Sequence, residues 1–385
     1  MKILFVVTDF DLGGITSSMQ NLTDLLIKKG HDVSVLNLPK RQLPNGFNEK
    51  IHLVELSGRA KLWNLSYTDI KQAKFFSKIK LCFLGFIKKL LNRNETWHKL
   101  IFKKTFLSGY DVAIGFRQSP LCFWFIKHKT DANTKKIGFW HGSLPYMGDL
   151  SGWDYTLKYL DKLACVSDAV KNEILLKYPF MSGKVFTVYN VFNSDIILAE
   201  SKKFDAGYDK SIFNIVTVAR IDFDQKQLNY IPYICRALID NNVKFKWTIV
   251  GDGADMNNLE TLMSSNGVSD YIELTGSKSN PFPYIRQADL FVLTSKCESY
   301  GMVVVESLIC NTPVVAAEYP ALKEILEDGV YGLIADNSIN GLTDAIYKMY
   351  SDKQTYNKIK DNCNGYKYSS NSVYKQFMDM VELNA

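Results

Sequence analysis

Short apolar segments alternate with helical patterns along the whole chain of 385 residues, and this alternation is the feature that most constrains its fold. It is typical of βαβ units around parallel sheets, whose strands are buried on both faces. The expected strands of the first half are residues 2–7, 33–38, 111–116, 136–140, 162–166 and 185–188, and those of the second half are 213–218, 246–250, 271–274, 290–293, 313–316 and 333–335. The pattern restarts near residue 211, so we expect two doubly wound α/β domains.

The length of the chain also favours two domains, because single hydrophobic cores stop growing at about 250–300 residues. We expect an N-terminal domain over residues 1–190, a polar linker over 191–210 and a C-terminal domain over 211–365. Residues 366–385 are typical of a helix, which we expect to pack back on the N-terminal domain. Two Rossmann-like domains place a ligand in the cleft between the carboxyl ends of their sheets.

Composition limits the partners and the compartment. The net charge of +6 is too small to indicate nucleic-acid binding. The seven cysteines are odd in number, scattered and without a C-x-x-C pair, which argues against disulfides or a zinc site and fits a reducing cytoplasm. No stretch of 18 apolar residues predicts a membrane span, and Asp9 and Asp11 end the first apolar run too early for a signal peptide.

Residues 71–104 depart from the regular pattern. They hold ten lysines and arginines against one acid, Glu95, and apolar side chains such as Phe83, Trp97 and Phe102 lie between them. A basic amphipathic helix is attracted to anionic lipid by about 1 kcal/mol per cation near the surface. We expect this segment to hold the protein peripherally on the anionic inner face of the cell membrane. The alternative is a solvated helix whose apolar face packs on its own domain.

Two cations, Arg220 and Lys226, follow the expected strand 213–218 and precede a helix expected at about 227–240. Their loop lies at the cleft and beside a helix N-terminus, where anions are favoured. Arginine offers a planar fork of donors and lysine a compact charge, which together suit a diphosphate whose charge grows as a glycosidic bond breaks. The alternative is two ordinary surface cations.

Two carboxylates, Glu298 and Glu306, are separated by seven residues that include Gly301. If a helix begins near Tyr300, the two acids lie on the order of 10 Å apart. That separation is too large for the carboxylate pair of a glycosidase. It suits a nucleotide sugar gripped at both ends, with one acid at the sugar hydroxyls, the other at the ribose diol and the helix N-terminus facing the phosphates.

In this order and spacing, these residues resemble the retaining glycosyltransferases of the GT-B fold, family 4 (glycosyl transferases group 1), of the bacterial surface-polysaccharide type. The resemblance runs over most of the second half of the chain. It includes Gly251-Asp252-Gly253, Leu259-Glu260, Gly276 to Asn280, Ala288 to Val292, Ser295, Asn311 to Ala316, Glu324-Ile325-Leu326, Gly329 and Gly332-Leu333. In the first half, Gly13-Gly14 resembles the family's glycine loop, and His141 resembles its histidine at the end of the fourth strand.

The resemblance implies a role for each matching residue. Arg220 and Lys226 would bind the diphosphate. Glu298 would hold the transferred sugar and Glu306 the ribose, while His141 would lie near the donor sugar. The residues implied to approach the donor through their backbones are Gly13, Gly14, Ser299, Tyr300, Gly301 and Met302. The family needs no cofactor, and the leaving phosphate takes the acceptor's proton on the same face.

The chain departs from the family pattern at several positions. Ala219 and Gln227 stand beside the two cations where glycines are usual, and Asn311 stands where glycine is common before Thr-Pro. Tyr319-Pro320-Ala321 lacks the glycines often found before the Glu-Ile-Leu segment, so the loop there could have a different shape. None of these changes removes a charged group.

Two D-x-D triplets, residues 9–11 and 222–224, could instead indicate a metal-bound nucleotide. The second lies between Arg220 and Lys226, which already supply the positive charge that a metal would bring. We therefore expect no metal.

The resemblance predicts a retaining glycosyltransferase that moves a sugar from a nucleoside diphosphate, with UDP the commonest, to a saccharide or lipid-linked saccharide in cell-surface polysaccharide synthesis. The main alternative is a sugar-nucleotide epimerase or hydrolase of the same fold, which would need no second substrate. A two-domain sugar-binding protein is a less favoured alternative, because it would not need the combination of Arg220, Lys226, Glu298 and Glu306. A phosphorylase of this fold would need a cofactor lysine, which no segment suggests.

Overall fold

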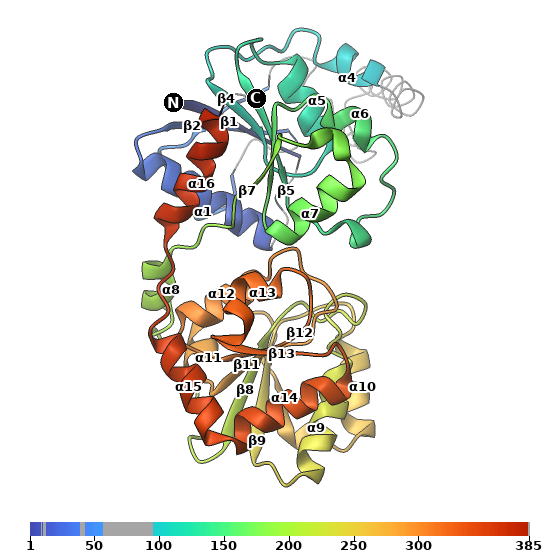
Figure 1. The fold of residues 1–385 in the computed structure, drawn as a ribbon, viewed down its shortest axis with the longest axis vertical. Helices are drawn as coiled ribbons and strands as arrows, with labels where there is room; N and C mark the ends of the chain where they lie inside the picture. The colour runs from blue at the N-terminus through green and yellow to red at the C-terminus, as the bar shows by residue number, and fades with distance from the viewer. Residues whose placement is uncertain (9, 11–12, 39–42, 57–94, 384–385) are drawn as a thin grey trace, which may run out of the picture.

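The structure is a computed structural model that describes residues 1–8, 10, 13–38, 43–56 and 95–383, and it contains two parallel sheets, one in each half of the chain (Figure 1). The first sheet lies in the upper part of the molecule and the second in the lower part, and both chain termini lie in the upper part. Two doubly wound α/β domains are therefore confirmed.

The N-terminal sheet has the strand order β3-β2-β1-β4-β5-β6-β7, with parallel pairing throughout. Its strands are β1 (Lys2–Val7), β2 (Asp32–Asn37), β3 (His52–Leu53), β4 (Val112–Gly115), β5 (Lys135–Trp140), β6 (Lys162–Cys165) and β7 (Val185–Thr187). Its helices are α1 (Gly14–Lys28), α4 (Glu95–Ile101), α5 (Pro120–His128), α6 (Trp153–Leu157) and α7 (Asp168–Lys177), with single turns at Leu144–Tyr146 and Pro179–Met181.

The C-terminal sheet repeats this arrangement with the order β10-β9-β8-β11-β12-β13. Its strands are β8 (Phe213–Val218), β9 (Phe245–Val250), β10 (Ile272–Leu274), β11 (Leu290–Leu293), β12 (Val314–Ala317) and β13 (Gly332–Ala335). Its helices are α9 (Tyr230–Asp240), α10 (Met256–Ser265), α11 (Phe282–Gln287), α12 (Met302–Ile309), α13 (Leu322–Leu326), α14 (Ile339–Ser351) and α15 (Lys353–Asn364), with single turns at Ser269–Tyr271 and Glu327–Gly329.

Each predicted strand is confirmed to within one residue at either end. The two-residue strand β3 was not predicted, because it is too short to show a pattern. Two predicted helix starts were early: α9 begins at Tyr230 rather than 227, and α12 at Met302 rather than Tyr300. In both cases a residue with left-handed backbone precedes the helix, Gln227 with φ +50° and Gly301 with φ +89°, and this conformation cannot continue a right-handed helix.

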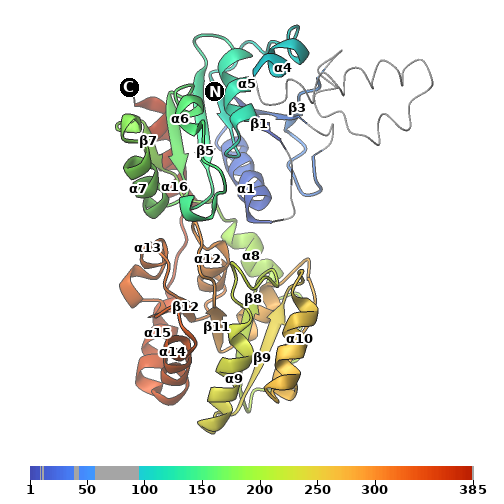
Figure 2. The ribbon, with the colours of Figure 1, turned by 90° about the vertical axis from the view of Figure 1, so that its right-hand side faces the viewer.

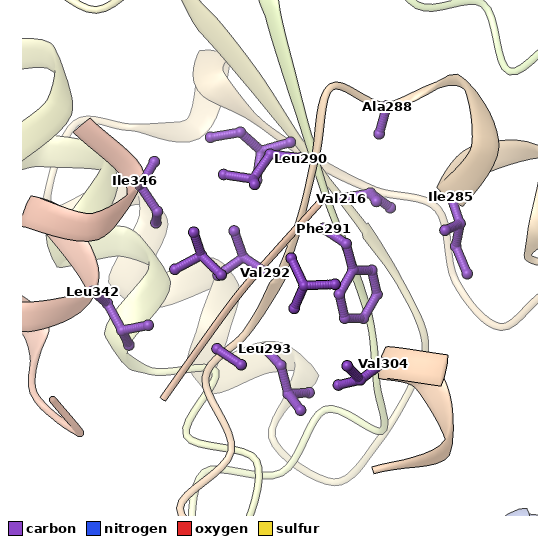
Figure 3. Close-up of a cluster of buried hydrophobic side chains, with 14 of the residues drawn as sticks. Val216, Ile285, Ala288, Leu290, Phe291, Val292, Leu293, Val304, Leu342 and Ile346 are labelled. Atoms are coloured by element: carbon purple, nitrogen blue, oxygen red, sulfur yellow. The ribbon is translucent and has the colours of Figure 1, made fainter. Parts of the chain in front are cut away.

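The core of the C-terminal domain shows why its strands are mostly apolar. The side chains of β11, Leu290 to Leu293, lie between helices on the two faces of the sheet (Figure 3). Leu342 and Ile346 of α14 cover one face, and Ile285 of α11 and Val304 of α12 cover the other. A strand buried on both faces favours apolar side chains, and β11 is apolar at every position, whereas β8 and β9 also bury Asn214, Thr217 and Thr248.

The chain crosses between the domains twice. The first crossing, expected as a polar linker, contains a helix, α8 (Ser194–Glu200), whose Asn193 side chain accepts a hydrogen bond from the Ile196 amide. The second crossing leads into α16 (Ser370–Glu382), which lies beside α1 in the N-terminal domain (Figures 1 and 2). Phe377 and Met380 of α16 are fully buried in the same cluster as Ile3 and Phe5 of β1. The last helix thus completes the core of the first domain.

Candidate active site

Both sheets have their topological switch point beside their first strand. β1 lies between β2 and β4, and β8 lies between β9 and β11. Crevices at the carboxyl ends of such strands are the usual ligand sites of doubly wound sheets. Loops that follow strands of both sheets line one cleft of about 700 Å³, a size typical of small-molecule sites.

The cleft brings together most of the residues singled out in the sequence. Its lining includes Gly13, Gly14, His141, Arg220, Lys226, Glu298, Ser299, Tyr300, Gly301 and Met302. The lining also contains Ser277 and Lys278 of the segment Gly276 to Asn280, and residues that the sequence did not indicate, namely Ile15, Asn190, Gln225 and Pro281. Glu306 is not part of the lining.

Lys226 and Glu298 form an ion pair, with 2.6 Å between Nζ and Oε1. Both side chains are mostly buried, with exposed fractions of 18% and 13%. The same carboxylate oxygen accepts a hydrogen bond of 2.8 Å from the Ser295 hydroxyl. The pair therefore lies at the cleft wall as a partly desolvated, hydrogen-bonded unit, in which electrostatic interactions are stronger than in bulk water.

Arg220 is more exposed than this pair. Its guanidinium lies 2.8 Å from the Asp222 carboxylate and 3.3 Å from the Gln225 side-chain oxygen. The other Asp222 oxygen accepts a hydrogen bond from the Gln225 amide. Asp222, the first carboxylate of the second D-x-D triplet, is thus already engaged by Arg220 and the backbone. Residues 9 and 11 of the first triplet lie outside the described residues. Within the described residues, no group of three or more His, Cys, Asp or Glu side chains is placed to hold a metal ion.

Two glycines explain how the Arg220 loop reaches the cleft. A side-chain carbon at Gly251 would lie 1.8 Å from the Ala219 carbonyl oxygen, and one at Gly253 would lie 2.1 Å from that of Ile221. The backbones touch here, because the Ile221 amide donates to the Asp252 carbonyl at 3.0 Å. The G-x-G segment after β9 therefore serves to pack one loop backbone directly against another.

The N-terminus of α12 opens toward the cleft. Gly301 precedes the helix in a left-handed conformation, and a side-chain carbon there would lie 2.0 Å from the Tyr319 hydroxyl. Gly301, Met302 and Val303 line the cleft, so the unsatisfied amides of the first turn face it. The resulting positive potential favours an anion.

Glu306 lies one helical turn beyond Met302 on the same face of α12. No hydrogen bond or ion pair to its carboxylate is formed by the residues that the structure describes. Burial raises its pKa to about 7. Its carboxylate thus has no protein partner within the described chain and lies one helical turn from the part of α12 that lines the cleft.

His141 is held at the end of β5 as a neutral ring. Its Nε2 lies 2.8 Å from the Phe116 carbonyl oxygen, which can only accept, so Nε2 carries the proton. Burial lowers the pKa of His141 to about 4. Nδ1 is then an unprotonated acceptor, and His141 brings no positive charge to the cleft at neutral pH.

The two domains contact each other around the 298–302 loop. The buried Ser167 hydroxyl donates to the Ser299 carbonyl at 2.7 Å. Glu324 of α13 accepts the amides of Asp168 and Ala169 at 2.9 and 2.8 Å, so a carboxylate from the C-terminal domain caps helix α7 of the N-terminal domain.

Three further contacts join the domains. The Tyr189 hydroxyl lies 3.2 Å from the Glu324 carboxylate, and its ring stacks on Tyr300 with centroids 5.4 Å apart. A side-chain carbon at Gly14 would lie 3.0 Å from the Met302 sulfur. Sequence inspection noted Glu324 only for its place in the resemblance and missed Ser167 and Tyr189, because their partners lie far along the chain.

The basic segment 71–104 is described only from residue 95 onward, so its lipid-binding role remains a prediction for the residues before that. In the described part, Trp97, Ile101 and Phe102 are buried in the N-terminal core, whereas Lys99, Lys103 and Lys104 are exposed. For these apolar side chains the expected lipid-facing role is wrong, because they pack on their own domain. In the described ranges no helix has both the length and the apolar character needed to cross a bilayer.

Comparisons with known proteins find similarity to glycosyltransferases. Residues 200–365 match the family model of glycosyl transferases group 1. An uncharacterized glycosyltransferase of Methanocaldococcus jannaschii is 27% identical over 240 residues, which span 57% of this chain and 62% of that protein. The GPI3 subunit of phosphatidylinositol N-acetylglucosaminyltransferase from Saccharomyces cerevisiae is 20% identical over 347 residues, 88% of this chain and 72% of that protein.

A solved structure shares the whole architecture. TarM of S. aureus, in complex with fondaparinux, alpha-GlcNAc-glycerol and UDP, superposes with a TM-score of 0.71 and 13% identity, covering 99% of this chain and 100% of that one. The chain therefore has the GT-B fold. Its C-terminal domain is similar to the group 1 glycosyltransferases, whose family model matches residues 200–365.

Proposed function

We propose that this protein is a retaining glycosyltransferase that uses a nucleoside diphosphate sugar, with UDP the preferred nucleotide, and a saccharide or lipid-linked saccharide acceptor. The observation that carries the proposal is the grouping of Lys226, Glu298, Arg220 and the open N-terminus of α12 in one cleft between two switch points. This grouping places cations and helix amides, which suit a diphosphate, beside a carboxylate that suits sugar hydroxyls.

The donor would lie with its diphosphate against Arg220, Lys226 and the first turn of α12. Glu298 would accept hydroxyl protons of the transferred sugar, and Glu306 those of the ribose. Binding of the diphosphate would draw Lys226 partly away from Glu298, exchanging a protein ion pair for one with the substrate and leaving the carboxylate free for the sugar. A charge placed at the leaving phosphate is worth most in the transition state, when that phosphate gains negative charge.

The reaction breaks the bond between the sugar's anomeric carbon and the diphosphate oxygen and forms one between that carbon and an acceptor hydroxyl oxygen. The acceptor proton passes to the leaving phosphate on the same face, which preserves the anomeric configuration. The products are a glycoside and a nucleoside diphosphate. No protein nucleophile is needed in this step.

A lipid-linked acceptor and a place on the cytoplasmic face of a membrane are the finer parts of the proposal. They rest on the basic composition of residues 71–104 and on the exposed Lys99, Lys103 and Lys104. Sedimentation with anionic and neutral vesicles tests this part. Replacing Lys78, Lys80, Lys88 and Lys89 with glutamine should abolish salt-sensitive binding to anionic vesicles, and unchanged binding would overturn it.

A screen of nucleotide sugars tests the main proposal. The purified protein is incubated with UDP-, GDP- and ADP-sugars, with and without saccharide acceptors and with excess chelator. We expect one nucleotide class to be turned over without added metal, and faster with acceptor than without. Loss of turnover in chelator that Mn²⁺ restores would contradict the metal-free mechanism. Conversion of the donor to an isomer without acceptor would support the epimerase alternative.

A further inference from the structure

Asn190 lies where the chain first crosses between the domains, and it lines the same cleft as Gly13, Gly14 and His141. Only 6% of the residue is exposed. Neither the spacing of the sequence nor the resemblance indicated it.

The orientation of the Asn190 amide is fixed by its neighbours. Its side-chain oxygen accepts a hydrogen bond of 2.6 Å from the hydroxyl of Ser18, which is itself 3% exposed on α1. Its backbone carbonyl accepts a hydrogen bond of 3.0 Å from the Tyr368 hydroxyl at the second crossing. The residue is thus held by the helix that follows the glycine loop and by the returning chain.

The amide nitrogen of Asn190 has no acceptor among the residues that the structure describes. A nearly buried amide donor is normally hydrogen-bonded, because leaving it unpaired costs its hydration. Since Ser18 occupies the oxygen, the two N–H groups are the atoms that the cleft wall offers to a ligand.

We propose that the Asn190 amide nitrogen donates a hydrogen bond to a hydroxyl oxygen of the transferred sugar and helps to select the donor sugar. This inference rests on the proposed function, because it assigns one end of the same donor site. Arg220, Lys226 and the start of α12 supply the cations and amides for the diphosphate at the C-terminal edge. Asn190 lies with neutral His141 at the opposite, N-terminal edge of the cleft. An uncharged N–H group there suits a neutral hydroxyl.

An amide whose N–H groups and oxygen are fixed in this way selects sugars by the position of their hydroxyls. A sugar that presents a hydroxyl to the amide satisfies a group that is otherwise unpaired, and a deoxy sugar leaves it unpaired. Sites built to hydrogen-bond a substrate hydroxyl reject the analogue that lacks it more strongly than apolar pockets reject an extra group. Asn190 therefore acts on the affinity for the sugar and leaves that for the bare nucleotide unchanged.

The test compares nucleotide and nucleotide-sugar binding by calorimetry. The probes are UDP, UDP-glucose, UDP-galactose and UDP-N-acetylglucosamine, followed by the monodeoxy analogues of whichever sugar nucleotide binds. The variants are Asn190→Asp, which keeps the shape and removes the N–H donors, and Ser18→Ala, which removes the group that orients the amide. Melting temperatures establish that each variant is folded.

We expect Asn190→Asp to bind UDP within about twofold of the parent protein and the sugar nucleotide about 10-fold or more weakly. One deoxy analogue should bind the parent protein more weakly than the full sugar nucleotide does, by a similar factor. The same analogue and the full sugar nucleotide should bind Asn190→Asp with nearly equal affinity, because the variant and the deoxy sugar each remove the same hydrogen bond. Ser18→Ala should show a smaller loss of the same kind. Equal weakening of UDP and UDP-sugar, or an unchanged ratio of the two affinities, would overturn the assignment.

Failure of the proposed function would have a different signature. In that case the parent protein would bind none of the nucleotides or nucleotide sugars. A binder for which no deoxy analogue is weakened through Asn190 would refute the role of Asn190 alone. If Asn190→Asp does not fold, two measurements still test the proposal: binding of the deoxy analogues to the parent protein, and binding of the full sugar nucleotide to Ser18→Ala. The proposal requires that affinity falls in both.

Discussion

The two edges of the cleft carry different chemistry, although both are built at the switch point of a sheet with the same strand order. The C-terminal edge is charged: Arg220, Lys226 and Glu298 surround the start of α12. The N-terminal edge has glycine backbone at Gly13 and Gly14 and a histidine whose pKa is lowered to about 4 by burial. One architecture therefore provides a site for anions on one side and a neutral, hydrogen-bonding wall on the other.

The two edges therefore have different roles in the proposed reaction. A diphosphate needs fixed positive charge where it leaves, and only the C-terminal edge supplies it within the described lining of the cleft, through Arg220 and Lys226 and through Lys278 on the same domain. A neutral sugar and an acceptor hydroxyl need hydrogen-bonding groups that do not compete for the phosphates. The N-terminal edge meets that need because His141 stays uncharged at neutral pH.

The largest expected effect comes from removing charge at the C-terminal edge. Lys226→Ala and Arg220→Ala should each lower turnover by about 10²-fold or more, the scale for loss of one transition-state stabiliser. Lys226→Ala should be the more damaging, because it also leaves the mostly buried Glu298 without its ion-pair partner. Steady-state kinetics with the identified donor provide the measurement.

A matched control separates local from general charge effects. Lys244 is an exposed lysine just before β9, at the opposite end of the C-terminal sheet from the cleft. Lys244→Ala should retain normal turnover. Near-normal rates in Lys226→Ala and Arg220→Ala would mean that the diphosphate site lies elsewhere.

The next effect distinguishes the two carboxylates of this edge. Glu298→Gln should lower turnover while UDP still binds, because Glu298 lies at the reacting sugar. Glu306→Gln should weaken UDP binding by about 10-fold, the scale of one or two hydrogen bonds to the ribose. Calorimetry with UDP beside turnover measurements tests the division. Equal loss of UDP affinity in the two variants would contradict it.

The pKa of Glu306 gives this division a pH dependence. Burial raises that pKa to about 7, so the carboxylate form that accepts both ribose hydroxyls is lost as the pH falls through 7. UDP affinity should therefore decline below about pH 7 in the parent protein and not in Glu306→Gln.

The stability of the ligand-free protein should follow the opposite course. An unfolded glutamate ionises above its ordinary value of 4.5, whereas folded Glu306 keeps its proton up to about pH 7. Folding thus takes up a proton between these values, and its free energy becomes less favourable as the pH rises through them. Glu306→Gln should raise the melting temperature more at pH 8 than at pH 5. If Glu306→Gln changed the melting temperature equally at pH 5 and pH 8, ionising Glu306 would not destabilise the folded protein, and the raised pKa would be wrong.

A smaller effect is expected from the contact that joins the two edges. Glu324→Ala would leave the Asp168 and Ala169 amides at the start of α7 without their acceptor, at a cost of about 0.5–2 kcal/mol for a lost helix cap. Because Ser167 of the same helix start holds the Ser299 carbonyl, we expect turnover to fall by a few-fold to about 10-fold, with UDP affinity almost unchanged. Glu318→Ala, which breaks only an exposed ion pair with Lys323, is the matched control.

The two edges also differed in how far the sequence could predict them. The strands and the charged residues of the C-terminal edge follow from local patterns and from order along the chain. The pairing of Lys226 with Glu298 spans 72 residues, and the cap formed by Glu324 on Asp168 spans 156. No local pattern encodes such contacts. Asn190 is equally hidden, because its importance depends on Ser18 occupying one side of its amide.

Departures from the family pattern proved informative where the backbone is strained. Gln227 and Asn311, which stand where the family commonly has glycine, both have left-handed backbone, with φ of +50° and +61°. The glycine that is common at these positions suits this conformation, a requirement that the structure, and not the sequence, identified. Ala219 is different: it has no left-handed backbone, and the close approach there is made by Gly251 opposite it.

The smallest effect concerns the backbone beside Lys226. A left-handed conformation costs a non-glycine residue about 1–2 kcal/mol, partly offset by the greater freedom that glycine loses on folding. The Gln227 side-chain oxygen is also buried without a partner within the described chain. Gln227→Gly should therefore stabilise the protein by about 0.5–1 kcal/mol, seen as a rise of about 1–4 °C in melting temperature. Asn311→Gly should gain less, because asparagine tolerates this conformation better.

Turnover in Gln227→Gly then shows whether the ion pair or the loop backbone holds Lys226 in place at the C-terminal edge. If the ion pair with Glu298 holds Lys226 in place, a more flexible neighbour should leave turnover unchanged while stability rises. A loss of turnover together with higher stability would mean that the rigid backbone at Gln227 is itself part of the diphosphate site. A lower melting temperature would contradict the strain at this position, and the glutamine would then have to stabilise the loop through contacts of its side chain.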